Sequence, residues 1–146
     1  MSQPGRKLIF VNLPVTDLDR SVAFYEAIGA RKDARFSDAT AAGMALSETI
    51  HVMLLTHDKY RQFTTKEIAD THKLSAALLC LSEDSRENVD ATVGKALAAG
   101  ASENRPPQDY GFMYGRSFDD PDGHGWEVMW MDLEAFLKAT GQSAAA

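Results

Sequence analysis

Two ionisable side chains occupy segments that are otherwise apolar, and both could take part in acid–base chemistry. In the segment 125–131, GWEVMWM, Glu127 is the single charged residue. In the segment 50–55, IHVMLL, His51 holds the second position in the same way. Burying a carboxylate is costly unless a partner compensates for the lost water. These residues are therefore our candidates for exchanging a proton with a ligand, or for binding it through hydrogen bonds.

The two segments also match each other. The stretch 50–55 aligns with 126–131 without a gap, which places His51 opposite Glu127 and Met53 opposite Met129. The pair Lys-Leu at 7–8 recurs at 73–74, before a second strand-and-helix pattern. Matches of this kind at a fixed spacing indicate an internal duplication.

The first copy contains one strand, one helix and three further strands. We expect a strand over 8–13 that ends at Pro14. A helix capped by Asp17 or Thr16 should follow and end at Gly29, since these residue types favour a helix start and a helix end. Short strands over 31–36 and 43–47 precede the strand that carries His51. The order predicts a βαβββ module.

The second copy repeats this order. We expect a strand over 74–81, a helix over 85–99, an edge strand over 101–105, and a hairpin of 110–118 and 125–131 across the turn DPDG at 120–123. The polar stretch between the copies contains Thr64-x-x-Glu67, which predicts a short helical turn. The prediction is one α+β domain over 1–146, with modules at about 6–56 and 74–132, a link at about 57–73 and a terminal helix at about 133–140.

Composition excludes several classes of protein. The chain has 146 residues, 45% of them apolar, and a net charge of −6, which offers no basic surface for nucleic acid or an anionic membrane. Its single cysteine, Cys80, excludes an internal disulfide. No apolar run reaches membrane-spanning length. The N-terminal segment lacks the pattern of a signal peptide, so we expect a cytoplasmic protein.

Two motifs resemble those of the vicinal oxygen chelate superfamily, which includes glyoxalase I, fosfomycin-resistance enzymes, extradiol dioxygenases and bleomycin-resistance proteins. They are Val-x-Asp-Leu-x-x-Ser-x-x-Phe-Tyr at 15–25 and Asp-Pro-Asp-Gly at 120–123, followed four residues later by Glu127. The resemblance implies a curled mixed sheet that forms an open cup, with the ligand on the concave side. It implies one small-molecule site and no particular reaction.

The resemblance also implies where a metal would bind. The four ligand positions of the metal-dependent members fall on Phe10, His51, Ala76 and Glu127. Phenylalanine and alanine cannot ligate a metal, and two donors are fewer than such sites supply. We therefore expect no catalytic metal. If a divalent metal is bound, its protein ligands are His51 and Glu127.

Other residues are predicted to contact the ligand. Apolar and amide side chains would line the cup, aromatic side chains would lie at its rim, and an arginine would either recognise an anionic group or pair with Glu127. In this order they are Phe10, Met53, Met129 and Asn12, then Tyr110 and Tyr114, then Arg116. The apolar members would serve equally well as ordinary core.

The sequence favours a homodimer that binds a small organic ligand without a catalytic metal, as resistance proteins sequester a drug. The alternative is a metal-dependent lyase, transferase or dioxygenase that uses His51 and Glu127 as ligands. A third hypothesis is an interaction module whose cup is filled by a neighbouring chain. Whether the modules pair within one chain or between two chains stays open.

Overall fold

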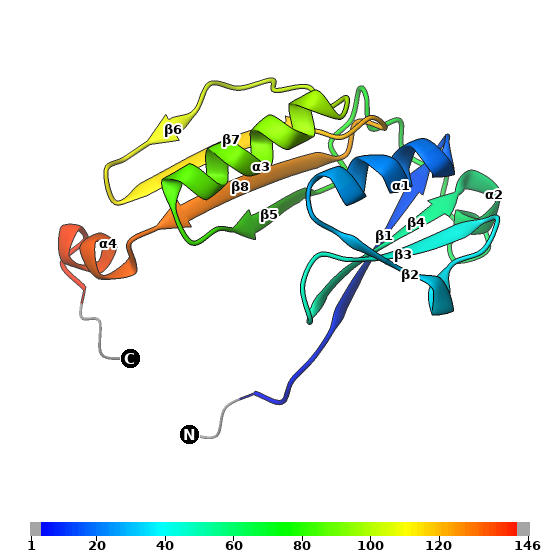
Figure 1. Ribbon diagram of the computed structural model, residues 1–146, viewed down its shortest axis with the longest axis horizontal. Helices are drawn as coiled ribbons and strands as arrows, with labels where there is room; N and C mark the ends of the chain where they lie inside the picture. The colour runs from blue at the N-terminus through cyan, green and yellow to red at the C-terminus, as the bar shows by residue number, and fades with distance from the viewer. Residues whose placement is uncertain (1–3, 143–146) are drawn as a thin grey trace. The chain divides into compact units, whose positions relative to one another are not determined.

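The computed structural model describes residues 4–142 and has an α+β fold with two four-stranded mixed sheets (Figure 1). The chain divides into two compact units, and the boundary lies between Asp70 and Thr71. Each unit contains one βαβββ module, so the predicted duplication is confirmed at the level of the fold. None of the helices within the described residues is long and apolar enough to cross a membrane.

The first unit forms a sheet with the strand order β1-β4-β3-β2, in which β1 and β4 are parallel and the other pairs antiparallel. Its elements are β1 (Ile9–Val15), α1 (Leu18–Ala27), β2 (Arg31–Asp33), a 3-10 turn η1 (Ala34–Phe36), β3 (Ala41–Ala45), β4 (Ile50–Thr56) and α2 (His57–Tyr60). The predicted end of the first strand at Pro14 is wrong. Within the described sheet β1 is an edge strand with β4 on one side, and an edge strand tolerates a residue that lacks a backbone N–H.

Helix α1 covers one face of this sheet (Figure 1). The Asp17 carboxylate accepts a hydrogen bond from the Arg20 backbone N–H, and Gly29 follows the helix with φ +104°, as the sequence predicts. The side chains between helix and sheet are fully buried: Phe24, Tyr25, Met44, Val52 and Leu54. Alternation along the strands therefore turns the neighbouring residues to the other face, which we call the open face of the first sheet.

The second unit repeats the arrangement, with the strand order β5-β8-β7-β6 and α3 across one face (Figure 1). Its elements are β5 (Leu78–Ser82), α3 (Arg86–Ala98), β6 (Gln108–Asp109), β7 (Met113–Asp119), β8 (Gly125–Met131) and α4 (Leu133–Ala139). Ser85 caps α3, and Val89, Val93 and Ala96 pack fully buried beneath it. The face opposite α3 is the open face of the second sheet.

Three local predictions are wrong. The motif at Thr64 starts no helix, although the Thr64 hydroxyl accepts a hydrogen bond from the Lys66 backbone N–H. The helical turn lies earlier, at α2, where Thr56 is the cap. Segment 101–105 contributes only the isolated bridge between Ser102 and Asp119, and the edge strand is β6. β5 begins at Leu78, so the segment 74–77 precedes the strand.

The turn at 120–123 is stabilised by hydrogen bonds to a buried side chain within the turn. The buried Asp120 carboxylate accepts two backbone hydrogen bonds at 2.9 Å, from Asp122 and His124. Gly123 has φ +87°, and the Thr71 backbone lies so close that an added Cβ would stand 2.6 Å from its carbonyl oxygen. Thr71 also donates its hydroxyl hydrogen to the Asp122 carbonyl at 2.6 Å. This turn fixes the register of β7 and β8, which carry the site in the second unit.

Candidate functional site

Glu127 lies on the open face of the second sheet. Trp126 and Val128, its neighbours on β8, are buried on the α3 side, as the alternation predicts. The register places Cys80 of β5 and Ser117 of β7 directly beside Glu127 on the same face. The side chain of Glu127 is half-buried and makes no hydrogen bond or ion pair with any residue from 4 to 142. A carboxylate is therefore presented with its acceptor oxygens available.

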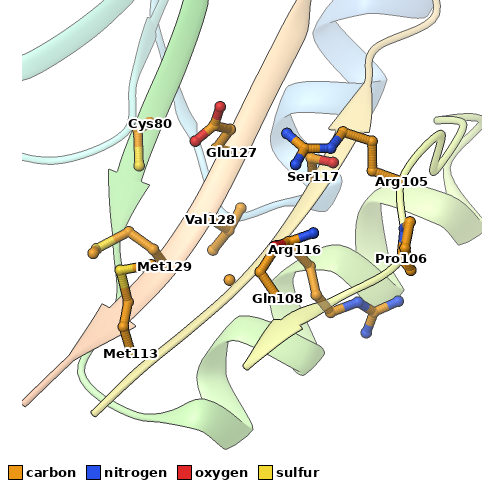
Figure 2. A pocket seen from close by; sticks show the side chains of 11 residues that line it. Cys80, Arg105, Pro106, Gln108, Met113, Arg116, Ser117, Glu127, Val128 and Met129 are labelled. Carbon is orange, nitrogen blue, oxygen red and sulfur yellow. The ribbon is translucent and has the colours of Figure 1, made fainter. Parts of the chain in front are cut away.

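A pocket of about 150 Å³ opens beside this carboxylate (Figure 2). Its other lining residues come from β5, β6, β7, β8 and the segment before β6: Cys80, Arg105, Pro106, Gln108, Met113, Gly115, Arg116, Ser117, Val128 and Met129. Gly115 lies between Met129 and Gln108 in the register, and its missing side chain leaves room over the sheet. Figure 2 shows the two methionines at one end of the pocket and Arg105 directed toward Ser117 at the other. The volume suits a one-ring molecule.

Cys80 is a poor nucleophile in this position. Partial burial raises the pKa of the Cys80 thiol, and the negative charge of Glu127 raises it further. The thiolate is the reactive form of cysteine, and it is disfavoured here. Cys80 therefore lines the pocket with a polarisable sulfur atom and does not supply a reactive thiolate.

Arg116 and Tyr114 are held on the α3 side of β7. The Arg116 guanidinium donates two hydrogen bonds to the Glu103 carboxylate, both 2.8 Å long, and a third of 3.0 Å to Asp90 on α3. The Tyr114 hydroxyl donates to the same Asp90 oxygen at 2.6 Å. The alternative pairing of Arg116 with Glu127 is wrong, because the register sets Arg116 opposite Val128 and turns its side chain to the other face.

This network changes the titration of its members. The hydrogen bonds from Arg116 lower the pKa of Glu103. The hydroxyl of Tyr114 and then the guanidinium of Arg116 lower the pKa of Asp90. The two carboxylates in turn raise the pKa of Arg116 above its ordinary value. Arg116 is thus satisfied by protein partners, and its predicted contact with a ligand stays untested.

His51 lies on the open face of the first sheet together with three other predicted site residues, Phe10, Asn12 and Met53. In the register, Phe10 is the partner of His51 and Asn12 the partner of Met53. The Phe10 and His51 rings stack with centroids 4.8 Å apart and planes 17° from parallel. His51 Nε2 lies 3.3 Å from the Glu48 carbonyl oxygen, which can accept a hydrogen bond from this nitrogen in the tautomer that carries the proton there. Nδ1 makes no hydrogen bond with any residue from 4 to 142.

Tyr110 lies next to the pocket of the second unit. The residue is 57% exposed, its ring stacks on Phe112, and its hydroxyl donates to the Gln108 side chain at 3.0 Å. Gln108 lines the pocket, so Tyr110 is connected to the pocket through its hydrogen bond with Gln108. Sequence reasoning missed Gln108 and Ser117. Counting back from the turn 120–123 would have set Ser117 opposite Glu127, because hairpin register follows from the turn.

A sequence model of one family matches residues 7–128, and its description is the Glyoxalase/Bleomycin resistance protein/Dioxygenase superfamily. The chain belongs to this superfamily. The match spans both modules, so the duplicated fold and the family assignment agree. A comparison with curated protein sequences gives no match.

Several solved structures share the fold. A hypothetical protein, SA1046 from S. aureus, is 24% identical with a TM-score of 0.72, and the match covers 89% of this chain and 94% of that one. A glyoxalase/bleomycin resistance protein/dioxygenase family enzyme from Burkholderia phytofirmans PsJN is 22% identical with a TM-score of 0.71, covering 86% and 98%. The fosfomycin resistance protein FosX from Mesorhizobium loti is 18% identical with a TM-score of 0.66, covering 92% and 99%.

Metal-dependent members of the glyoxalase superfamily assemble several donors around one ion. Among the residues the structure describes, no three His, Cys, Asp or Glu side chains form a group that could hold a metal ion. The first sheet offers His51, stacked on Phe10 at the neighbouring family position, and the second offers Glu127, with Cys80 beside it. One imidazole and one carboxylate are too few for the octahedral or open tetrahedral sites of such enzymes. These residues do not fit the family's metal centre.

Proposed function

We propose that this protein binds small organic molecules on the open face of each sheet, without a catalytic metal. Glu127 is the polar anchor on the second sheet and His51 the polar anchor on the first. The observation that carries the proposal is the half-buried Glu127 carboxylate, which has no hydrogen-bond partner among residues 4–142 and stands beside a pocket of about 150 Å³. A carboxylate left in such a position is available to a ligand that donates an N–H or O–H group.

The walls of this pocket support an apolar ligand body. Met113 and Met129 are flexible and polarisable, and such side chains adapt to ligands of different shape. Gly115 keeps the floor open between Met129 and Gln108. The ligand favoured by these features is a one-ring molecule with a single hydrogen-bond donor directed at Glu127.

Two isomeric probes test this preference. Benzyl alcohol carries a hydroxyl donor, and anisole, with the same atoms, carries none. We expect benzyl alcohol to shift the backbone amide signals of Glu127 and Met129 in two-dimensional NMR and to bind at least about tenfold more tightly than anisole, because a hydrogen bond to a charged group contributes about 1.5–3 kcal/mol. The substitution Glu127→Leu should abolish the difference between the probes without lowering the stability of the protein.

The matched control is Glu87→Leu, which removes an exposed carboxylate from α3, outside the pocket, and should leave both affinities unchanged. Equal affinity of the two probes for the unsubstituted protein would contradict the proposal. So would stoichiometric metal in protein purified without chelators after expression with nickel, zinc, manganese and iron available. If that metal were lost in His51→Ala and in Glu127→Leu, the metal-dependent lyase, transferase or dioxygenase would replace the present proposal.

We also propose that the protein is a homodimer in which a second copy covers the edge strands β1 and β5. Within its own sheet each of these strands pairs on one side only. A large apolar residue at the start of each strand is exposed: Ile9 by 56% and Leu78 by 65%. Edge strands with exposed apolar side chains favour association with another strand.

Light scattering coupled to gel filtration tests the homodimer. We expect twice the mass of one chain for the unsubstituted protein, and the mass of one chain for the double substitution Ile9→Lys and Leu78→Lys, because a lysine at the edge opposes strand pairing. The control is Phe63→Lys, which places the same charge at a residue that is 68% exposed and lies outside the strands. A single-chain mass for the unsubstituted protein would refute the homodimer.

A further inference from the structure

The open face of the first sheet carries a second and larger pocket, of about 730 Å³. His51 lines it, but most of its wall is charged and takes no part in the function proposed above. The charged lining residues are Arg6, Arg31, Lys32 and Arg35 on the basic side and Asp33 and Glu48 on the acidic side. Basic residues are thus in excess, although the whole chain has a net charge of −6. This pocket is a basic site on an acidic protein.

Ion pairing inside the pocket leaves one arginine available. Arg35 donates two hydrogen bonds to the Asp33 carboxylate, of 3.0 and 2.8 Å, and the pair lowers the Asp33 pKa to about 2. Arg6 lies 3.5 Å from Glu48. The side chain of Arg31 makes no hydrogen bond or ion pair with any residue in the described range 4–142, and its charge adds a smaller contribution to the lowering of the Asp33 pKa.

The register shows which basic side chains reach the open face. Lys32 is the partner of Met44, which is fully buried under α1, so Lys32 belongs to the α1 side. Arg31 is the partner of Ala45, and Ala45 is the partner of His51. Arg31 therefore belongs to the same face as the imidazole.

One row of residues crosses all four strands at this level. It runs from Phe10 on β1 through His51 on β4 and Ala45 on β3 to Arg31 on β2. The row begins with two stacked rings, has a methyl group in the middle and ends with a guanidinium. Two strand spacings separate His51 from Arg31, which is about 10 Å between their backbones. A single ring with one attached charged group matches this length.

We propose that the pocket binds a planar organic acid, with the carboxylate of the acid on Arg31 and its flat apolar part beside Phe10 and His51 over Ala45. A guanidinium recognises a carboxylate through two parallel hydrogen bonds, which gives Arg31 both the charge and the geometry for this contact. The small side chain of Ala45 leaves room for the ring. The inference rests on the proposed ligand-binding function and specifies that the ligand of the first sheet is negatively charged.

The test uses three probes on the full chain, followed by NMR of the backbone amides. Benzoate is a planar organic acid, benzamide is its neutral counterpart of the same size, and inorganic phosphate is an anion without a ring. We expect benzoate to shift the signals of Arg31, Ala45 and His51 and to bind at least about tenfold more tightly than benzamide and phosphate. Arg31→Gln should weaken benzoate binding about tenfold and leave benzamide binding unchanged. Arg31→Lys keeps the charge and loses the planar fork. Its affinity for benzoate should lie between that of the unsubstituted protein and that of Arg31→Gln.

Arg61→Gln is the matched control. It removes one positive charge from the same unit, at an arginine that pairs with Asp58 outside the pocket, and it should not change benzoate binding. The proposal is overturned if benzoate and benzamide bind equally, if Arg61→Gln weakens benzoate as much as Arg31→Gln, or if phosphate shifts the same signals as tightly as benzoate. Benzyl alcohol reports on Glu127 in the other unit. If benzoate binding does not depend on Arg31 while benzyl alcohol still binds at Glu127, only the proposal of an organic acid is refuted. If benzoate binds through Arg31 and benzyl alcohol does not bind at Glu127, only the proposed role of Glu127 is refuted.

Discussion

Gly123→Ala is expected to destabilise the protein by about 2–4 kcal/mol, the largest effect of any single substitution considered for this chain. Two costs combine at this position. The backbone has φ +87°, and a residue with a Cβ in this conformation raises the free energy of the folded state by about 1–2 kcal/mol. The added Cβ would also stand 2.6 Å from the Thr71 carbonyl oxygen, and a backbone atom cannot move aside as a flexible side chain does. Urea unfolding followed by circular dichroism measures the change.

Gly100→Ala separates the two costs. Gly100 lies in the same unit and also has a positive φ, of +111°, but the nearest atom to an added Cβ is Pro121 Cγ at 3.9 Å, an ordinary contact. The expected loss at Gly100 is therefore only about 1–2 kcal/mol. Equal losses for the two substitutions would show that the contact between Gly123 and the Thr71 backbone is absent from the protein in solution.

The fold could be predicted from the sequence where the signals were local. The caps at Asp17 and Ser85 mark helix starts, because their side chains accept hydrogen bonds from the first helical turn. The period of two along GWEVMWM placed Glu127 and Trp126 on opposite faces of β8, since alternation depends only on the strand itself. These features need no knowledge of what the strand packs against.

The errors arose where tertiary contacts decided the outcome. Pro14 continues β1 because that strand lies at the edge of its sheet, which the sequence does not state. Thr64 and Glu67 have the spacing of a capping box, but no helix forms in this segment, and the helical turn follows Thr56 instead. Local propensity is a weak prior, and surrounding structure overrides it.

The candidate site was predictable in part for the same reason. Phe10, Asn12, His51 and Met53 share one face because alternation within β1 and β4 requires it. The partners of Arg116 were not predicted, because Glu103 and Asp90 lie on other elements, and their approach depends on how the segment before β6 and α3 pack against β7. Arg31 was missed because a short strand with a charged residue at its start gives no signal for the face it occupies.

Arg116→Met is expected to destabilise the protein by about 2 kcal/mol. Methionine keeps the apolar stem and removes the guanidinium, which leaves the Glu103 and Asp90 carboxylates without their shared cation. The side chains of Arg116 and Glu103 are only 17% and 21% exposed, so water compensates poorly for the loss. Arg61→Met is the control, because the pair of Arg61 and Asp58 is largely exposed, and its removal should cost less than about 1 kcal/mol.

The difference in stability between Arg116→Met and the unsubstituted protein should also depend on pH. Hydrogen bonds in the folded protein lower the pKa of Glu103 and of Asp90, so the stabilisation from these groups is complete above their unfolded pKa values, near 4, and is lost as the pH falls through the lower folded values. We expect the full difference at neutral pH and a smaller one below about pH 4. A double-mutant cycle of Arg116→Met with Glu103→Gln should show coupling, and a cycle with Glu127→Leu should be additive. Coupling to Glu127 would mean that the carboxylate assigned to the ligand is instead held by Arg116.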